Sequence, residues 1–498
     1  MGDRTDNQPA GTTAGNRATP GAEPKHLRFL PGLVLVLITL GFLPSVGFDF
    51  VNWDDDIHVY ANPTVLGTAS ARDRWLTPSL GYPIPLTVAS YRIEYQLVGA
   101  SPWLYHTTNL LLHLGVCGLL YGLARRIGLG KVGASFALLF FGLHPVVAEP
   151  VSWISGRKDL LAALLGLAAT WWFLGASARP ERRWRAAIGS TVLFALAACS
   201  KPSVLALPLA WALARSERSI RHWRMALPAV VMAVALAAFS WLGQSHVGAL
   251  HASGSPVGWA RELLYALGYH LGLALFIQQP LAKHIPAHMP PWFDPSVDLF
   301  PLGIGLLTWI LLRRMADRPG RAARFGLLFA VAAYLPSSGI VPLTRYLADC
   351  YVYLPLAGLA WLVGAAVETI RPFLRPLWRW AGGCAAALVL LVACTTTSMA
   401  WSNGITLWAT VYQRYPDSPQ VCLNFGNAYS ERGRLETALR IFERCTVRFG
   451  PDHFAKNRAI ALYLVGRKQE ARGLFQDLHA RDPNDPVVRK YLGFLGSE

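Results

Sequence analysis

The sequence has few charged residues, and acidic residues are the scarcest. Only 15% of the 498 residues are Asp, Glu, Lys or Arg, against about 25% in a typical soluble protein. The chain has 29 acidic and 46 basic residues. Apolar runs of about 20 residues recur along most of its length, which is typical of transmembrane helices. These features argue against an ordinary soluble domain and predict an all-α, polytopic membrane protein.

Patterns for binding metals or nucleic acids are also missing. The seven Cys residues are scattered, with no CxxC pair and no His spacing typical of zinc. The net charge of +17 could suggest nucleic acid. However, the Arg and Lys residues gather in short segments between apolar runs, where they orient membrane helices. We therefore expect no metal, no cofactor and no nucleic-acid partner.

The apolar runs predict about eleven transmembrane helices. They cover approximately residues 29–46, 104–123, 132–148, 159–176, 186–199, 202–214, 226–243, 298–312, 325–342, 351–368 and 381–399. The basic segments that alternate with them, such as 124–131 and 313–324, are expected in the cytoplasm together with the N-terminus. The C-terminus and four segments are then expected on the outer face: 47–103, 149–158, 244–297 and 343–350.

One further apolar run does not fit this alternation. Residues 262–280 are long enough to cross a membrane, but counting them as a span would place the basic segment 313–324 outside. That placement would contradict the usual charge bias. We therefore interpret residues 262–280 as a re-entrant or interfacial helix in a large outer loop.

The composition divides the chain into three parts. Residues 1–28 are polar and predict a disordered cytoplasmic tail, residues 29–400 form the membrane domain, and residues 401–498 form a soluble outer domain. In that last part, Gly433, Ala438 and Phe442 recur 33 residues later, which is typical of tetratricopeptide (TPR) repeats. We expect two repeats, at about 417–450 and 451–483, followed by a capping helix.

Two cysteines of the first repeat are expected to face each other. Cys422 and Cys445 lie on its two predicted helices. An outer location would permit a disulfide between them, and two small buried thiols are an equally good interpretation.

Three consecutive aspartates follow the first apolar run, in the segment FDFVNWDDDIHVYANP. Like charges in sequence repel and raise the pKa of at least one carboxyl group, which suits a general base. Asp54, Asp55 and Asp56 could instead cap a short helix or lie in a solvated loop.

Cations also gather on the predicted outer face. Arg157 and Lys158 lie there against the usual charge bias, and Lys201 and Arg345 lie near outer helix ends. Such residues bind anionic groups of ligands or extend toward lipid headgroups. His144 and Glu149 flank a proline-containing helix end, where they could orient a substrate or make a structural contact.

Several segments in order, among them FVNWDDDIHVYANP, HPVVAEPVSWISGRKDLLAALLGL and LADCYVYLPLAGL, resemble the membrane-embedded glycosyltransferases of the GT-C class. The sequence is most similar to bacterial proteins with TPR tails, which are relatives of the transmembrane-and-TPR O-mannosyltransferases. The resemblance covers about residues 30–495. It implies a lipid-phosphate-linked sugar donor, an outer-facing active site and an inverting transfer.

The resemblance also assigns roles to particular residues. It maps an acidic pair, one member of which is the catalytic base, onto Asp54 and Asp55. Two further motifs map onto residues that would orient the substrate: His144, Glu149, Asp349 and Tyr351. Ile84 and Cys350 stand where the family usually has Arg, and we expect Arg345 or Arg92 to replace these cations.

The expected function is transfer of a sugar from a polyprenyl-phosphate carrier to an acceptor hydroxyl of protein Ser or Thr. The donor phosphate would be bound without metal by Arg157, Lys158, Lys201, Arg345 and Arg92. The TPR tail would recruit the polypeptide acceptor, and the protein would reside among the lipids of a bacterial inner membrane. Two alternatives are a transporter or flippase of lipid-linked sugars, and a TPR scaffold whose membrane domain has lost its activity.

Overall fold

The computed structural model describes residues 25–70, 84–176, 183–213, 220–246, 255–284, 299–314, 318–341 and 345–496. All regular structure in these segments is helical, with no strand, which confirms the predicted all-α class. The N-terminal segment predicted to be disordered lies almost entirely outside the described residues.

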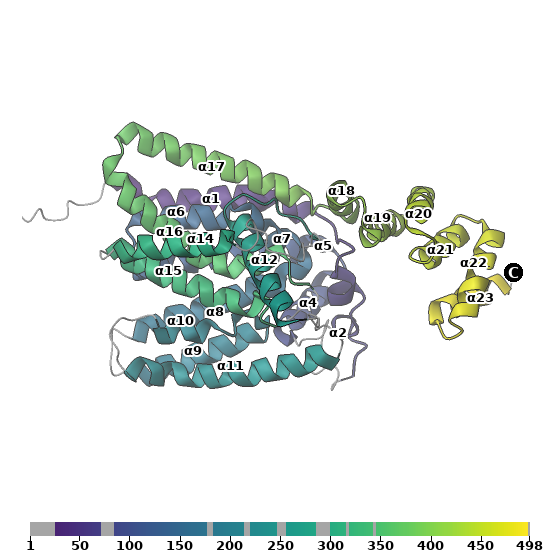
Figure 1. The fold of residues 1–498 in the computed structure, drawn as a ribbon, viewed down its shortest axis with the longest axis horizontal. Helices are drawn as coiled ribbons and strands as arrows, with labels where there is room; N and C mark the ends of the chain where they lie inside the picture. Colours follow the sequence, from purple (N-terminus) through teal and green to yellow (C-terminus); the bar gives the residue numbers. More distant parts are fainter. Residues whose placement is uncertain are drawn as a thin grey trace, which may run out of the picture.

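The membrane part is a bundle of helices (Figure 1). Its helices are α1 (Leu30–Phe42), α4 (Pro85–Val98), α5 (Pro102–Arg126), α6 (Lys131–Gly142), α8 (Arg157–Ala176), α9 (Arg183–Ala198), α10 (Leu207–Leu213), α11 (Ile220–His246), α12 (Pro256–Ala274), α14 (Phe300–Arg314), α15 (Arg318–Tyr334), α16 (Tyr353–Ile370) and α17 (Pro376–Met399). Short helices join them, including η3 (Asp56–Tyr60), α2 (Pro63–Leu66), α7 (Ala148–Ser152) and η9 (Asp349–Val352).

By length and composition, six of the described helical segments can cross a membrane. They are Leu30–Gly47, Pro102–Arg126, Ile154–Gly175, Trp223–Gly243, Asp349–Phe373 and Pro376–Met399. A bent pair, α6 with the turn Pro145–Ser152, adds a seventh if it is counted as one span. The chain is therefore a multi-pass membrane protein. The count of eleven spans stays a prediction, because α9, α14 and α15 are each shorter than 18 residues.

The bend between α6 and α7 interrupts a predicted span at residues 132–148. The two helical segments meet at 53°, because Pro145 lacks the N–H that would continue the helix. His144 lies at this break and accepts a hydrogen bond from the backbone N–H of Val146 (3.2 Å). The bend is followed by residues 149–156, which are buried and contribute to the polar site.

Small residues let neighbouring helices approach closely within the bundle. Helix α16 packs along α15 and along α6. A Cβ atom at Gly358 would collide with the backbone carbonyl of Gly326, and one at Gly364 would collide with that of Gly133. Glycines at such crossings are common in membrane bundles, because they allow van der Waals contact between backbones.

Helix α12 covers much of the apolar run that we interpret as re-entrant or interfacial. It runs across the bundle at an angle to the long helices (Figure 1), and it is not among the segments that can span a membrane. The chain leaves it through Phe276, whose φ is +60°, and continues to residues 281–284 beside the polar site.

The soluble tail consists of paired helices. They are α18 (Gly404–Arg414), α19 (Pro419–Glu431), α20 (Leu435–Phe449), α21 (Ala455–Leu464), α22 (Lys468–Arg481) and α23 (Pro486–Gly496). Helix α19 packs on α20 and α21 packs on α22, as expected for two repeats and a cap. Gly426 lies against the ring of Phe442 and leaves no space for a Cβ atom. The assignment as TPR repeats stays a prediction.

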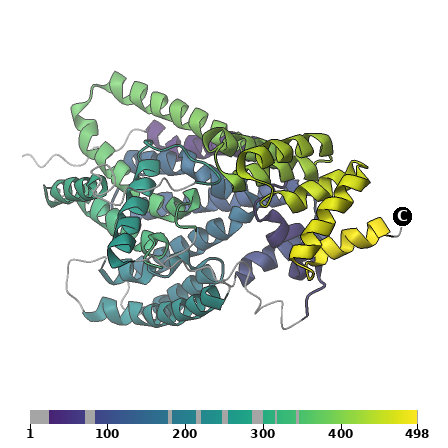
Figure 2. The same ribbon diagram turned by 45° about the vertical axis from the view of Figure 1, so that its right-hand side comes forward.

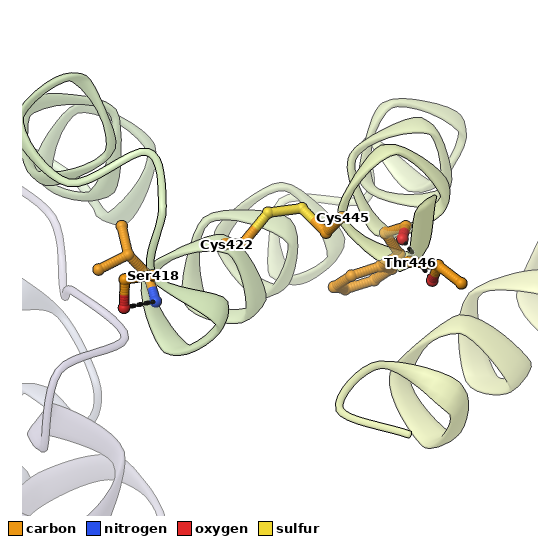
Figure 3. Close-up of a disulfide and its surroundings, with 6 residues drawn as sticks. Ser418, Cys422, Cys445 and Thr446 are labelled. Atoms are coloured by element: carbon orange, nitrogen blue, oxygen red, sulfur yellow. Dashed lines mark hydrogen bonds between the residues drawn. A yellow bond between two sulfur atoms is a disulfide. The ribbon is translucent and has the colours of Figure 1, made fainter. Parts of the chain in front are cut away.

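A disulfide joins the helices of the first pair. Cys422 on α19 is bonded to Cys445 on α20, with their Cα atoms 6.3 Å apart, as Figure 3 shows. Both residues are buried. Of the two alternatives left open by the sequence, this structure adopts the disulfide.

The tail and the aspartate loop lie at the same end of the bundle. In both overall views the tail lies beside the segment that contains α2 (Figures 1 and 2), and the connection between α16 and α17 lies at the opposite end (Figure 1). The aspartate loop and the tail therefore share one end of the molecule, where the polar side chains gather.

Candidate functional site

The aspartate loop has an unusual backbone. Asp54 has a φ of +63°, in the left-handed region that few residues other than Gly adopt, although Asn and Asp tolerate it better than most. The side chain of Asp54 is partly exposed. Such a conformation costs free energy and persists only where the surrounding contacts hold it.

Asp55 is fully buried and is held by hydrogen bonds. Its carboxylate accepts them from the backbone N–H of Val51 (3.0 Å) and from the backbone N–H (3.0 Å) and hydroxyl (2.5 Å) of Ser155. Burial raises the pKa of Asp55 to about 7, although these hydrogen bonds oppose the shift. Asp55 thus joins the aspartate loop to the turn before α8.

Two tryptophans lie beside the aspartates. The indole N–H of Trp153 donates to the backbone carbonyl of Trp53 (2.8 Å). Trp153 also stacks on Trp401, with ring centroids 5.6 Å apart, and Trp53 meets Trp408 edge to face at 5.3 Å. Aromatic pairs at these distances are favourable beyond their buried area, so the two tryptophans form a rigid apolar support for the loop.

Three cations lie against these two indole rings. The Lys158 ammonium is 4.3 Å from the Trp153 ring centroid. Arg345 (5.2 Å) and Lys283 (5.6 Å) both lie over the Trp53 ring, within the distance of cation–π attraction. Asp54 interacts electrostatically with Lys158 and with Arg345. Asp54 is therefore within electrostatic range of Lys158 and Arg345, and Lys283 lies over the ring of Trp53, its neighbour in the chain.

Sequence reasoning missed Lys283. Its ammonium donates to the side-chain carbonyl of Gln420 in the tail (2.5 Å). Burial, and then the neighbouring charge of Arg345, lower the pKa of Lys283 to about 8. The sequence could have indicated Lys283, because it is a cation in a loop predicted to lie outside and it directly precedes a segment rich in His and Pro.

Arg157 is buried and fully engaged within the protein. Its guanidinium donates to Glu94 (2.5 Å), to the side chain of Asn109 (2.9 Å) and to the backbone carbonyl of Tyr105 (2.9 Å). It also lies 4.5 Å from the ring centroid of Tyr91. This geometry gives Arg157 a structural position and does not support the predicted contact with a donor phosphate.

Lys201 is buried near the same site and is paired with an acidic residue. Its ammonium lies 2.6 Å from Asp159 and 3.8 Å from the sulfur of Cys350. It also lies 5.4 Å from the Tyr351 ring centroid. Cys350, where the resemblance leads us to expect Arg, is thus packed against a neighbouring cation.

Three of the residues predicted to orient the substrate, Glu149, Tyr351 and His144, make hydrogen bonds within the protein. Glu149 accepts hydrogen bonds from the Arg345 guanidinium (3.1 Å) and from the backbone N–H of Cys350 (3.1 Å). The Tyr351 hydroxyl donates to the backbone carbonyl of Arg345 (2.8 Å). His144 lies 3.3 Å from the backbone carbonyl of Ala274. Glu149 and Tyr351 therefore hold Arg345 in place, and His144 contacts the end of α12.

Asp349 fixes the segment that carries Lys283. Its carboxylate accepts a hydrogen bond from the backbone N–H of Leu281 (2.8 Å) and pairs with His284 (2.7 Å). The other ring nitrogen of His284 bonds to the hydroxyl of Tyr269. Asp349 is thus placed to position Lys283, with no direct contact to it.

Arg92 lies apart from the cluster. Its guanidinium donates to the backbone carbonyl of Thr64 (2.6 Å) at the end of α2. Ile84, where the resemblance leads us to expect a cation, is buried in an apolar cluster with Val59 and Tyr105. Of the two proposed replacements for the missing cations, only Arg345 is in the cluster.

No group of three or more His, Cys, Asp or Glu residues that could hold a metal ion occurs in the described part of the chain. The expectation that the reaction needs no metal stays a prediction.

The fold and the site together define a polytopic helical membrane protein with an acid–cation cluster where the aspartate loop meets the C-terminal helical tail. Within that class, the sequence is similar to curated O-mannosyl-transferases. Tmtc1 of Drosophila melanogaster is 31% identical over 197 residues, which cover 37% of this chain and 22% of that protein. Tmtc2 of the same organism is 33% identical over 188 residues, which cover 33% and 19%. TMTC2 of Homo sapiens is 38% identical over 109 residues, which cover 18% and 13%.

These matches confirm the resemblance to the transmembrane-and-TPR O-mannosyltransferases. The matched region spans about a fifth of the length of the two Drosophila proteins. No family model matches the chain. Among solved structures, ArnT from Cupriavidus metallidurans bound to undecaprenyl phosphate aligns over 95% of this chain and 85% of its own, with 16% identity and a TM-score of 0.43.

Proposed function

We propose that the protein is a glycosyltransferase that moves a sugar from a polyprenyl-phosphate carrier to a Ser or Thr hydroxyl of a polypeptide. The observation that supports the proposal is that Asp54 interacts with Lys158 and Arg345, and that these two cations and Lys283 lie against the rings of Trp53 and Trp153. A base next to a cluster of cations suits a reaction that takes a proton at one atom and releases a phosphate at another. The names of the similar curated proteins also favour this reaction.

In the proposed reaction, the acceptor oxygen attacks the anomeric carbon while the bond from that carbon to the phosphate oxygen breaks. The acceptor proton passes to the Asp54 carboxylate, and the polyprenyl phosphate leaves with one more negative charge. Arg345, Lys283 and Lys158 stabilise that developing charge. Attack opposite to the leaving group inverts the configuration of the sugar.

We assign the base to Asp54 and a positioning role to Asp55. Asp54 is partly exposed and interacts with the cations, whereas Asp55 is fully buried and accepts three hydrogen bonds from its own protein. Lys201 is already paired with Asp159. We therefore assign it an indirect role, in which its positive charge adds to that of the site without contacting the donor phosphate. The two uncharged residues Ile84 and Cys350 stand where the resemblance predicts cations, which would favour a site that has lost its activity. Lys283 supplies a cation from another segment and therefore argues against that alternative.

The location follows from the charge pattern. We propose that the site and the tail face the outside of a bacterial inner membrane, with the basic connections in the cytoplasm. The paired helices of the tail would hold an extended polypeptide acceptor near Asp54, as grooves between helical repeats do.

The test is transfer of radiolabelled sugar from a polyprenyl-phosphate donor to candidate peptides by the purified protein. Asp54→Asn should lower the transfer rate by roughly 10²–10⁴-fold, the usual contribution of a general base. Because Asn also tolerates positive φ, the loop should keep its conformation. Asp452→Asn, an exposed tail carboxylate, is the matched control and should keep full activity.

Other outcomes would favour the alternatives. Movement of the labelled lipid across a vesicle membrane without transfer would favour a flippase. A wild-type protein that neither binds nor consumes the donor would favour a scaffold. Full turnover of Asp54→Asn would remove Asp54 as the base.

A further inference from the structure

We infer that helices α18 and α19 of the tail are a positioning element of the catalytic site, and that they hold the aspartate loop in its active conformation. This inference rests on the proposed function and extends it, because a tail that only recruited acceptors would not need to touch the loop. The contacts that support it converge on the residues just before Asp54.

The first group of contacts is polar. The side-chain amide of Asn52 donates to the backbone carbonyl of Asn424 on α19 (3.2 Å). The backbone N–H of Asp49 donates to the carbonyl of Ser402, just before α18 (3.0 Å). Arg432, at the end of α19, pairs with the Asp49 carboxylate (2.6 Å). Three separate points of the tail thus bind residues 49–52.

The second group is apolar. One buried cluster contains Phe48 and Val51 of the loop, Trp153 of the turn before α8, and Trp408 and Val421 of the tail. Trp408 is completely buried, and its ring meets that of Trp53. The indole that supports Lys283 and Arg345 is therefore packed against the tail.

The strained backbone explains why such contacts matter. Asp54 has φ +63°, and the loop is held on one side by Ser155 through Asp55 and on the other by the tail through Asn52 and Trp53. A residue in this conformation keeps it only where its neighbours determine it from both sides. Loss of the tail contacts would free one side and let the Asp54 carboxylate move away from its cations.

The experiment compares kcat and acceptor KM in the full-length protein, with a short Ser/Thr peptide as acceptor. Trp408→Leu removes the ring contact with Trp53, and Asn52→Ala removes the bond to Asn424. We expect kcat to fall by roughly 10–100-fold for Trp408→Leu, because a displacement of about 1 Å can cost 10²-fold in rate. Asn52→Ala should also lower kcat, but by a smaller factor than Trp408→Leu. Trp408→Phe keeps an aromatic ring and should retain most of the wild-type kcat.

Two control variants change the tail away from the loop. Phe475→Leu alters a ring buried in the tail core, and Lys456→Ala removes an ion pair with Asp485 (2.8 Å) that involves neither α18 nor α19. Both should keep kcat. The slow hydrolysis of the donor by water, which needs no peptide, should fall in Trp408→Leu together with kcat.

The results separate the inference from the proposed function. If Trp408→Leu and Asn52→Ala raise acceptor KM and leave kcat and donor hydrolysis unchanged, the tail only recruits acceptors and the inference is wrong. If Trp408→Leu does not fold, an unchanged kcat in Asn52→Ala is sufficient to overturn it. A wild-type protein without transfer or hydrolysis would instead refute the proposed function itself.

Discussion

Asp54 and Asp55 are neighbours in the chain, but their carboxylates lie in opposite environments. Asp54 faces cations and is partly exposed, and Asp55 is buried among hydrogen-bond donors. Sequence reasoning proposed both as the base, because it saw the like charges and not the Ser155 turn, which comes from a segment 100 residues away. The structure places the two carboxylates in different environments, and on that basis we propose Asp54 as the base and Asp55 as a positioning residue.

The raised pKa of Asp55 predicts how stability depends on pH. An unfolded Asp loses its proton near pH 4, whereas folded Asp55 keeps it until about pH 7. The contribution of Asp55 to stability is therefore present below about pH 4 and is lost as the pH rises through about 7. Asp55→Asn, which does not titrate, should flatten this part of the profile. Thermal unfolding in detergent between pH 4.5 and 8 measures it, and identical slopes for both proteins would contradict the prediction.

Arg157 and Lys158 should respond differently to mutation, although they are adjacent. Removing one partner of the buried Arg157–Glu94 pair leaves an uncompensated charge and costs about 3–5 kcal/mol, so Arg157→Gln should lower the yield of folded protein. Lys158 is held by the Trp153 ring, and Lys158→Gln should fold normally and bind polyprenyl phosphate more weakly. Yield by fluorescence-detected gel filtration and lipid binding in nanodiscs measure both; equal yields would contradict the prediction.

The residue types on the outer face could be predicted from the sequence, but their partners could not. Lys158 and Arg345 were identified because cations are unusual there. Arg157 has the same signal, and its partners Glu94 and Asn109 come from α4 and α5, which no local pattern reveals. Lys283 was missed because its significance depends on Trp53, more than 200 positions earlier.

At the scale of elements, the disulfide joins the helix that touches the loop to the rest of the tail. It closes a loop with a sequence separation of 23, which predicts about 3 kcal/mol of stabilisation by loop closure. Cys422→Ala with Cys445→Ala should lower the thermal midpoint of the tail, and Cys384→Ala, in an exposed position on α17, should not. Alkylation of the denatured protein with and without reductant, followed by mass spectrometry, establishes the bond. Two free thiols in the unreduced protein would contradict it.

The interface between the tail and the loop should also depend on pH. Burial, and then the nearby Asp56, raise the pKa of Glu431 at the end of α19 to about 7, and Arg432 opposes this shift. Tyr60 also faces Glu431. The stabilisation is present at low pH and is lost as the pH rises through about 7. Limited proteolysis of the tail should therefore be faster at pH 8 than at pH 6, and Glu431→Gln should remove the difference; an unchanged difference would contradict this.

The long apolar runs of the sequence predicted the long membrane helices well. The sequence was a poorer guide to the positions at which helices bend or break. Helix α5 extends over the whole predicted span 104–123, whereas 132–148 is bent by 53° at Pro145. Of the predicted span 202–214, the described residues 202–213 form a 3-10 turn and the short helix α10. A hydropathy pattern records how apolar a run is, and the proline positions within it determine where the helix breaks.

For the whole molecule, α17 offers a direct test of the orientation. Its 24 residues extend roughly 36 Å at 1.5 Å per residue, enough to cross a hydrocarbon core of about 30 Å. Arg375→Cys and Asn403→Cys, placed at its two ends in a background without the five free cysteines, should be labelled by an impermeant maleimide from opposite sides. Asn403→Cys should react from outside. Labelling of both from one side would contradict the proposed topology.

The contact between Asn52 and Asn424 joins residues 372 positions apart, and this separation has a consequence for synthesis. At about 5–20 residues per second, the loop of Asp54 leaves the ribosome roughly 20–75 s before the helices that complete its surroundings. A nascent chain already inserted among donor lipids would therefore hold an unfinished site throughout that interval. If the proposed function is correct, the protein would begin to consume its sugar donor only after α18 and α19 have been made and have folded against the loop.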